Sequence, residues 1–218
     1  MVIITKTGTY RFKVVLYGPS LSGKTVMLNR LQELYPSRRT RIYSVEEPSG
    51  RTLFFDYMVV SAGDNNRFVF DIYTVPGQRR HARQRRVILN QVDCVIFVAD
   101  SDPQAVRENA ISFKELKRYL GGILRKIPLI IAVNKRDLSD ALPVRLIVRA
   151  LGLDKIVPIF PTIAIEGIGI KELFKESFKL TMLARFFPAI YKREINRTLS
   201  LYEKYVPEEL LKRPLIKI

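Results

Sequence analysis

Residues 18–25, Gly-Pro-Ser-Leu-Ser-Gly-Lys-Thr, match the phosphate-binding pattern G-x-x-x-x-G-K-[ST] at every fixed position. A β-branched and aromatic run over residues 12–17 precedes the motif and predicts a strand, and residues 26–34 follow it with apolar side chains at helical spacing. Strand, glycine-bounded loop and helix start together form an anion site, because backbone N–H groups and the positive end of the helix dipole converge on phosphate oxygens. The motif in this context predicts an α/β fold of the P-loop type.

Two side chains of this loop carry its expected chemistry. Lys24 is placed to reach the β- and γ-phosphates of a bound nucleotide, and the Thr25 hydroxyl is placed to bind Mg²⁺. The other residues expected to contact the nucleotide here are Gly18, Ser20, Leu21, Ser22, Gly23 and Val26. The sequence therefore predicts a nucleoside triphosphate site with a divalent cation.

Strand-like and helix-like runs alternate along the rest of the chain, which predicts a mixed, mostly parallel sheet of six strands with helices on both faces. The expected strands are 11–17, 52–61, 66–74, 93–99, 128–133 and 156–161, and the expected helices are 24–35, 79–91, 103–124, 143–151 and 169–185. A short turn at 62–66 joins two alternating runs, so we expect those two strands to form an antiparallel hairpin. The polar segment 36–50 is predicted to be a loop that can switch between ordered and disordered states.

The pattern changes after residue 185. Phe186, Phe187 and Pro188 interrupt the last helix, and residues 189–205 predict a further helix rich in Lys and Arg. We therefore expect a nucleotide-binding domain over residues 1–185 and a basic C-terminal helical extension over residues 186–218.

The chain is strongly basic, with 37 Lys and Arg residues against 21 Asp and Glu residues and a formal net charge of +16. Such a balance is typical of a protein with an anionic partner, which can be a nucleic acid, a membrane surface or an acidic protein, although a solvated repulsive surface is an equal alternative. No apolar run reaches the roughly 18 residues that a bilayer span needs, and the N-terminus lacks a signal-peptide layout. The single cysteine, Cys94, excludes a disulfide within the chain, and together these features predict a cytoplasmic protein.

A second motif concerns the base of the nucleotide. Residues 134–137, Asn-Lys-Arg-Asp, fit N-K-x-D directly after a predicted strand. The Asp137 carboxylate can accept hydrogen bonds from guanine N1–H and the 2-amino group, whereas adenine offers neither and would leave the carboxylate unpaired. We expect Asn134 to tie this loop to the phosphate-binding loop, the stem of Lys135 to lie along the base, and the backbone N–H of Ala164 to face guanine O6.

A third segment, Thr-Val-Pro-Gly-Gln at 74–78, ends the second hairpin strand. In a GTPase a glycine here offers its N–H to the γ-phosphate, and the next residue orients the attacking water, which are the places of Gly77 and Gln78. The usual pattern begins with an aspartate that holds Mg²⁺ through water, and this chain has Thr74 instead. The departure predicts weaker metal binding or a shift of this task to another part of the site.

Arg51 and Thr52 precede the first hairpin strand. Thr52 is the candidate switch threonine, which would close over the nucleotide as a second ligand of Mg²⁺ beside Thr25. Arg51 can reach the developing charge on the transferred phosphoryl group, as arginine fingers supplied in cis do; the alternative is a loop arginine exposed to water. The expected catalytic residues are therefore Gln78, Arg51 and Lys24.

Four segments make the chain resemble the MglA-type small GTPases, the prokaryotic Ras-like switches of bacterial polarity and gliding motility: residues 51–56, 74–78, 98–101 and 134–138. The resemblance covers roughly residues 9–180, and threonine in place of aspartate at position 74 is itself a mark of that group. It implies a Ras-like P-loop NTPase fold, GTP hydrolysis with Mg²⁺, and a roadblock-type partner that acts as an activating protein. The basic composition and the C-terminal extension suggest an archaeal member.

We therefore predict a small GTPase of slow intrinsic rate that cycles between GTP and GDP states to control partner binding in polarity, motility or trafficking. The arginine-rich segment Arg79–Arg86 follows Gln78 and is expected to be a nucleotide-gated surface for an acidic partner or a membrane, with a solvated helix face as the alternative. Two other functions remain open. The charge would suit an RNA- or ribosome-associated GTPase, and Thr74 would suit a nucleotide-sensing scaffold without catalysis.

Overall fold

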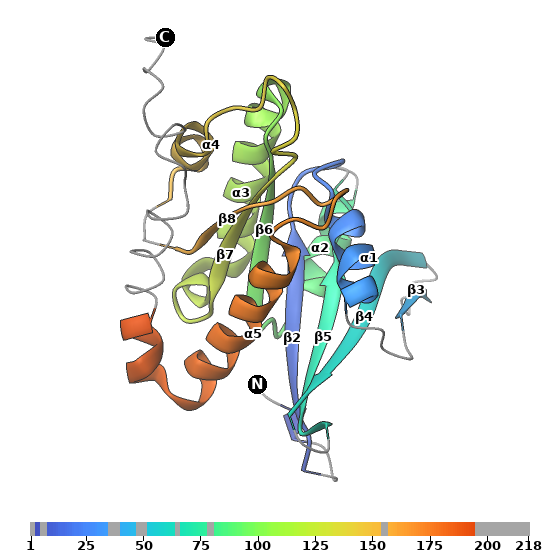
Figure 1. Ribbon diagram of the computed structural model, residues 1–218. Helices are drawn as coiled ribbons and strands as arrows, with labels where there is room; N and C mark the ends of the chain where they lie inside the picture. Colours follow the sequence, from blue (N-terminus) through green and yellow to red (C-terminus); the bar gives the residue numbers. More distant parts are fainter. Residues whose placement is uncertain are drawn as a thin grey trace.

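The computed structural model describes residues 3–4, 8–34, 40–46, 52–63, 66–77, 81–153 and 157–194, with the backbone alone for 3–4, 40–46 and 52–54. One twisted sheet runs through the molecule and carries helices on both faces (Figure 1). Its strands are β1 (Ile3–Ile4), β2 (Tyr10–Tyr17), β3 (Thr40–Glu46), β4 (Thr52–Ala62), β5 (Phe68–Thr74), β6 (Cys94–Asp100), β7 (Leu129–Asn134) and β8 (Ile159–Pro161). The α-helices are α1 (Lys24–Leu34), α2 (Ala82–Ile88), α3 (Val106–Leu120), α4 (Val144–Leu151) and α5 (Ile170–Phe186), and two short 3₁₀ helices are η3 (Pro103–Ala105) and η4 (Gly121–Arg125).

The sheet is mixed and mostly parallel, as predicted. Its strand order is β3-β4-β5-β2-β6-β7-β8, with β1 pairing to β2 outside this path. Strand β2 is parallel to both neighbours, β5 and β6, and β6, β7 and β8 continue in parallel. Strand β4 is antiparallel to β5, which confirms the hairpin predicted across residues 62–66.

All six predicted strands are present, and β1 and β3 extend the sheet beyond them. Strand β3 occupies residues 40–46, inside the segment predicted to be a loop, and pairs antiparallel with β4 along its length. Arg41, Ser44 and Glu46 interrupt the apolar pattern by which a strand is recognised in sequence. An edge strand can tolerate such a pattern, because the ladder to its single neighbour depends on backbone groups rather than on a buried face.

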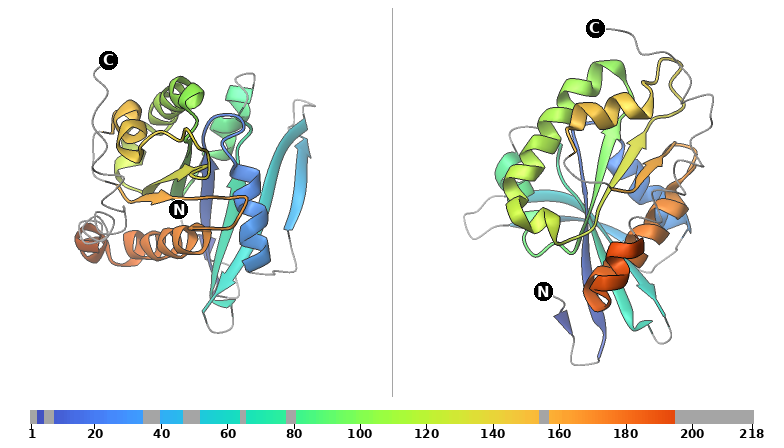
Figure 2. Two further views of the ribbon diagram at one scale, coloured as in Figure 1. Left: turned by 45° about the horizontal axis from the view of Figure 1, so that its top comes forward. Right: turned by 90° about the vertical axis from the view of Figure 1, so that its left-hand side faces the viewer.

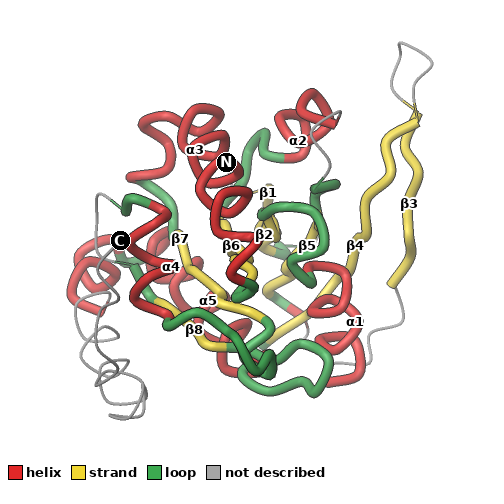
Figure 3. The backbone as a smooth tube through the Cα atoms, turned by 90° about the horizontal axis from the view of Figure 1, so that it is seen from above, coloured by secondary structure: helices red, strands yellow, loops and turns green. Residues whose placement is uncertain are grey.

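Helices cover both faces of the sheet (Figure 2), and the core lies in two layers, one on each face. Alternate residues of β2 serve the two layers: Val14 and Leu16 pack with α1 and α5, whereas Val15 and Tyr17 pack with α2, α3 and α4. Every residue of β6 and β7 is buried, as expected of central parallel strands covered on both faces. Strand β2 thus lies in the middle of the sheet, between β5 and β6. The loops at its carboxyl end gather where ligands bind in open α/β sheets, the end that faces the reader in Figure 3.

The predicted break at residues 186–188 is confirmed. Helix α5 ends at Phe186, and a further helical segment begins at residue 188 and is described as far as residue 194. It packs back onto the domain, because Tyr191 lies against the core layer of α5 and Glu194 forms an ion pair of 2.9 Å with Lys179. The remainder of the helix predicted for 189–205 lies outside the described residues. Among the helices that are described, none is long and apolar enough to cross a membrane.

Candidate functional site

The phosphate-binding motif forms the predicted strand–loop–helix unit. Strand β2 ends at Tyr17 and helix α1 begins at Lys24, so the loop lies at a helix N-terminus, where the first N–H groups have no intrahelical acceptor. Gly23 has a φ of +95°, and a Cβ at this position would approach Nδ2 of Asn134 to 2.2 Å. Only glycine fits here, because any side chain would collide with the neighbouring loop.

Lys24 is folded over this loop. Its side chain is buried, and Nζ donates hydrogen bonds to the backbone oxygens of Gly18 at 3.0 Å and Pro19 at 2.6 Å. Burial and, to a smaller extent, the positive charge of Arg85 lower the pKa of Lys24, the carboxylate of Asp56 partly opposes both, and the pKa is about 8. Phosphate oxygens beside Nζ would stabilise the charged ammonium, so this lysine is suited to an anionic ligand.

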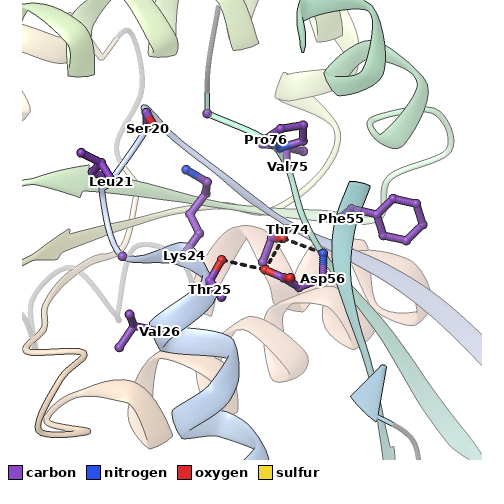
Figure 4. Close-up of a pocket in the computed structure, with 12 residues that line it drawn as sticks. Ser20, Leu21, Lys24, Thr25, Val26, Phe55, Asp56, Thr74, Val75 and Pro76 are labelled. Carbon is purple, nitrogen blue, oxygen red and sulfur yellow. Dashed lines mark hydrogen bonds between the residues drawn. The ribbon is translucent and has the colours of Figure 1, made fainter. Parts of the chain in front are cut away.

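A cavity of about 400 Å³ opens beside Lys24 (Figure 4). Three parts of the chain line it, namely the phosphate-binding loop with the start of α1, strand β4, and the end of β5 with the segment that follows it. The lining residues are Ser20, Leu21, Gly23, Lys24, Thr25, Val26, Phe55, Asp56, Thr74, Val75, Pro76 and Gly77. The fold thus brings Gly77 and the predicted phosphate-binding residues into the lining of one pocket, except for Gly18 and Ser22.

Asp56 supplies a carboxylate at this pocket that the sequence analysis did not identify as a site residue. Its Oδ2 accepts hydrogen bonds from the Thr25 hydroxyl at 2.6 Å and from the Thr74 hydroxyl at 3.0 Å, and its backbone N–H donates to Thr74 Oγ1 at 3.0 Å. Figure 4 shows both hydroxyls directed at this carboxylate. Thr74, which replaces the usual aspartate, therefore holds an aspartate from the neighbouring strand.

The hairpin register could have revealed Asp56. Tyr57 pairs with Tyr73, which sets Asp56 beside Thr74 across the antiparallel ladder. Together with Thr25, these residues offer hydroxyl and carboxylate oxygens, the donor type that Mg²⁺ prefers, and one or two carboxylates beside substrate phosphates suffice for that ion. Within the described part of the chain, no group of three or more His, Cys, Asp or Glu residues forms a separate metal cluster.

Asn134 ties the base-side loops to the phosphate-binding loop, as predicted. Its buried amide donates from Nδ2 to the backbone oxygen of Ser22 at 2.9 Å. Its Oδ1 accepts from the Thr162 hydroxyl at 3.1 Å and from the backbone N–H of Ala164 at 3.0 Å. The Ala164 N–H is therefore bonded within the protein, and its contact with guanine O6 stays a prediction.

Lys135 and Asp137 lie on the same loop, directly after β7. Lys135 has a φ of +63°, and its Nζ forms an ion pair of 2.7 Å with Oδ2 of Asp100 at the end of β6. Oδ1 of Asp100 accepts from the backbone N–H of Asp102 at 3.1 Å, which fixes the carboxylate. Asp137 is exposed, so its carboxylate can meet a ligand.

The segment with Gly77 lies directly on the phosphate-binding loop. A Cβ on Gly77 would come within 2.4 Å of both N and Cα of Ser20, so the contact depends on glycine. Two predicted catalytic residues, Arg51 and Gln78, lie outside the described residues. Thr52 begins β4, and its backbone alone is described.

The arginine-rich segment is not a uniform surface. Arg83 and Arg86 are exposed on α2, whereas Arg85 is buried and forms an ion pair of 2.8 Å with Glu115 of α3. The prediction of a surface cluster is therefore wrong for Arg85. Arg79 and Arg80 lie outside the described residues.

Comparison with known proteins agrees with this geometry. The family model of the ADP-ribosylation factor family, Arf, matches residues 2–179. Mutual gliding-motility protein MglA of Myxococcus xanthus (strain DK1622) is 36% identical over 176 residues, which cover 78% of this chain and 90% of that protein. ADP-ribosylation factor-like protein 4A of Homo sapiens is 26% identical over 169 residues, which cover 74% of this chain and 78% of that protein.

Proposed function

Because this chain belongs to the ADP-ribosylation factor family and is therefore a small GTPase, we propose that the cavity beside Lys24 is where it binds and hydrolyses GTP. The observation that carries the proposal is the convergence of the phosphate-binding loop, Asp56 and Gly77 on this one cavity. Lys24 contacts the β- and γ-phosphates, the loop amides from Gly18 to Gly23 surround them, and the Gly77 N–H meets the γ-phosphate. Asp137 and Lys135 hold the guanine base.

The same cavity would hold the Mg²⁺ that small GTPases use with their nucleotide. We infer that the Thr25 hydroxyl and the Asp56 carboxylate hold the ion, with Thr52 joining them in the GTP state, and that Asp56 replaces the aspartate missing at Thr74. When bound, Mg²⁺ neutralises charge on the phosphates. Thr74 contributes by orienting Asp56 through two hydrogen bonds.

Asp56→Asn is expected to raise the Mg²⁺ concentration that half-maximally slows GDP release by about 10- to 100-fold, because an anionic oxygen becomes a neutral amide. The measurement is release of a fluorescent GDP across a Mg²⁺ titration. The double variant Asp56→Asn, Thr74→Asp returns a carboxylate to the neighbouring strand and should recover most of the loss. An unchanged Mg²⁺ dependence in the single variant would remove Asp56 from the metal site.

In the hydrolytic step, a water molecule attacks the γ-phosphorus in line and the bond to the β-phosphate oxygen breaks. We propose that Gln78 orients this water, that Lys24 stabilises the phosphate oxygens, and that Arg51 reaches the charge that develops on them. The intrinsic rate is slow. Repeated release of phosphate with excess GTP would exclude the alternative of a sensing scaffold without catalysis.

Gln78→Leu is expected to slow single-turnover GTP hydrolysis about 100-fold, because the attacking water loses the side chain that orients it. GTP affinity should stay within threefold of the unaltered protein, since this residue does not hold the ground-state nucleotide. The rate is measured by phosphate release from preloaded protein. A normal single-turnover rate would show that Gln78 has no part in the reaction.

The relative from Myxococcus xanthus is named for gliding motility. We propose that this chain likewise controls a process of the polarity, motility or trafficking kind from the cytoplasm, with a roadblock-type partner that acts as activating protein or effector. The exposed Arg83 and Arg86 of α2 are the proposed contact for an acidic partner or a peripheral membrane surface. An archaeal source and the division into a G domain (1–185) and an extension (186–218) belong to the same proposal.

A pull-down of a roadblock-fold protein with GTP- and GDP-loaded protein tests the partner. Preference for the GTP form supports a switch, and equal capture by both forms contradicts one. Tight RNA binding that weakens steeply with salt would favour the RNA-associated alternative.

A further inference from the structure

Glu115 of α3 joins three side chains that lie outside the nucleotide-binding motifs. Its Oε2 accepts a hydrogen bond from the Tyr17 hydroxyl at 2.8 Å, and its Oε1 accepts from Arg85 Nη2 and from the Tyr119 hydroxyl, each at 2.8 Å. The Arg85 side chain is 4% exposed and that of Glu115 is 17% exposed, so the pair is shielded from solvent. Burial by itself would raise the pKa of Glu115, but the bonds from Arg85, Tyr119 and Tyr17 lower it overall. The lowered pKa favours the charged carboxylate, which accepts three hydrogen bonds within the protein.

Two of these partners connect Glu115 to the loops that hold phosphate. Tyr17 is the last residue of β2 and immediately precedes Gly18, so its side chain anchors the strand at the point where the phosphate-binding loop begins. Arg85 uses its other terminal nitrogen, Nη1, to donate to the backbone oxygen of Pro76 at 3.1 Å. One carboxylate on α3 thus supports both sides of the cavity.

The hydrogen bond from Arg85 to the Pro76 carbonyl affects the orientation of the Gly77 N–H, which is the proposed donor to the γ-phosphate. The carbonyl of Pro76 and the N–H of Gly77 belong to one planar trans peptide, in which C=O and N–H point in opposite directions. Holding the carbonyl against Arg85 therefore turns the Gly77 N–H away from Arg85. The close contact of Gly77 with Ser20 seats this peptide on the phosphate-binding loop. A hydrogen bond at the carbonyl also polarises the amide and strengthens its N–H as a donor.

We propose that Arg85 and Glu115 are positioning residues that orient the Gly77 N–H for the γ-phosphate of GTP. The proposal rests on the proposed nucleotide site. Arg85 supplies a planar fork that can bond Glu115 and Pro76 at once, which a lysine ammonium on a flexible stem reproduces poorly. The Glu115 carboxylate holds the Arg85 guanidinium in place, and hydrogen bonds from the Tyr17 and Tyr119 hydroxyls hold that carboxylate.

Altering Arg85 or Glu115 should weaken the binding of GTP but not of GDP, because GDP has no γ-phosphate for the Gly77 N–H to contact. Glu115→Gln and Arg85→Lys should each weaken binding of a non-hydrolysable GTP analogue about tenfold, as expected for one hydrogen bond to a charged group. GDP affinity should remain within twofold. Both affinities are measured by competition with a fluorescent GDP, and the ratio of the two is the readout.

A purely structural role for the pair gives a different result. Loss of packing between α2 and α3 would lower the melting temperature and weaken GDP and the GTP analogue alike, leaving their ratio unchanged. Glu108→Gln, an exposed carboxylate on the same helix, is the matched control and should leave the ratio unaltered. If Glu115→Gln does not fold, Arg85→Lys carries the same measurement, since it keeps a cation against Glu115.

The result that overturns the proposal is an unchanged ratio in both variants while the unaltered protein binds both nucleotides and hydrolyses GTP. Failure of the proposed function itself would appear differently, as absence of guanine-nucleotide binding in the unaltered protein.

Discussion

Asp137→Asn is expected to lower the affinity for GTP and GDP about 1,000-fold. Its carboxylate is exposed on the loop after β7, and the loop is held in place by Asn134 and by the Lys135–Asp100 ion pair. In the proposed complex the carboxylate accepts two hydrogen bonds from guanine, and bonds to a charged group contribute about 1.5–3 kcal/mol each. An asparagine amide carries no charge and presents a donor where guanine also presents one. Competition with a fluorescent GDP measures the loss.

The base itself provides the control for this prediction. Xanthine has an oxygen where guanine has its 2-amino group, so Asp137→Asn should bind xanthosine nucleotides more tightly than the unaltered protein does. Asp140→Asn, an exposed carboxylate three residues further along, should change neither affinity. Unchanged GTP affinity in Asp137→Asn would mean that another group reads the base. Equal loss of affinity for guanosine and xanthosine nucleotides would point to a disturbed loop instead of altered recognition.

Arg51→Ala is expected to slow single-turnover GTP hydrolysis about 1,000-fold, the lower end of the range for an arginine finger. The guanidinium acts on charge that develops in the transition state, so GTP affinity should change little. The rate is followed by phosphate release from protein preloaded with GTP and Mg²⁺.

Arg51→Lys serves as the matched variant, because it keeps a cation but loses the planar fork. Its hydrolysis rate should fall between those of the unaltered protein and Arg51→Ala. Arg107→Ala, an exposed arginine on α3, should hydrolyse GTP at the normal rate. If Arg51→Ala left the intrinsic and the partner-stimulated rates unchanged, no arginine would be supplied in cis.

Several long-range features escaped sequence analysis because they depend on how separate elements meet. Strand β3 is recognisable through its pairing with β4 rather than through its own residues. The hydrogen bond from the Ala164 N–H to Asn134 Oδ1 joins two loops that are 30 positions apart in the chain. The sequence predicts that Arg85 is exposed like the other arginines of residues 79–86, because nothing in the local sequence shows that Arg85 pairs with Glu115 of α3.

The sequence by itself determined the phosphate-binding loop, the hairpin between β4 and β5 and the buried central strands. Each of these depends on neighbouring residues, whose turn chemistry and apolar period act over a few peptide units. Only the tertiary structure decided that Asp56 meets Thr25 and Thr74, and that Glu115 supports Arg85. These contacts join residues 18 to 31 positions apart, so they depend on strand register and helix packing. The loop of residues 18–25 therefore specifies that phosphate is bound, and the packing around it specifies which carboxylates serve the site.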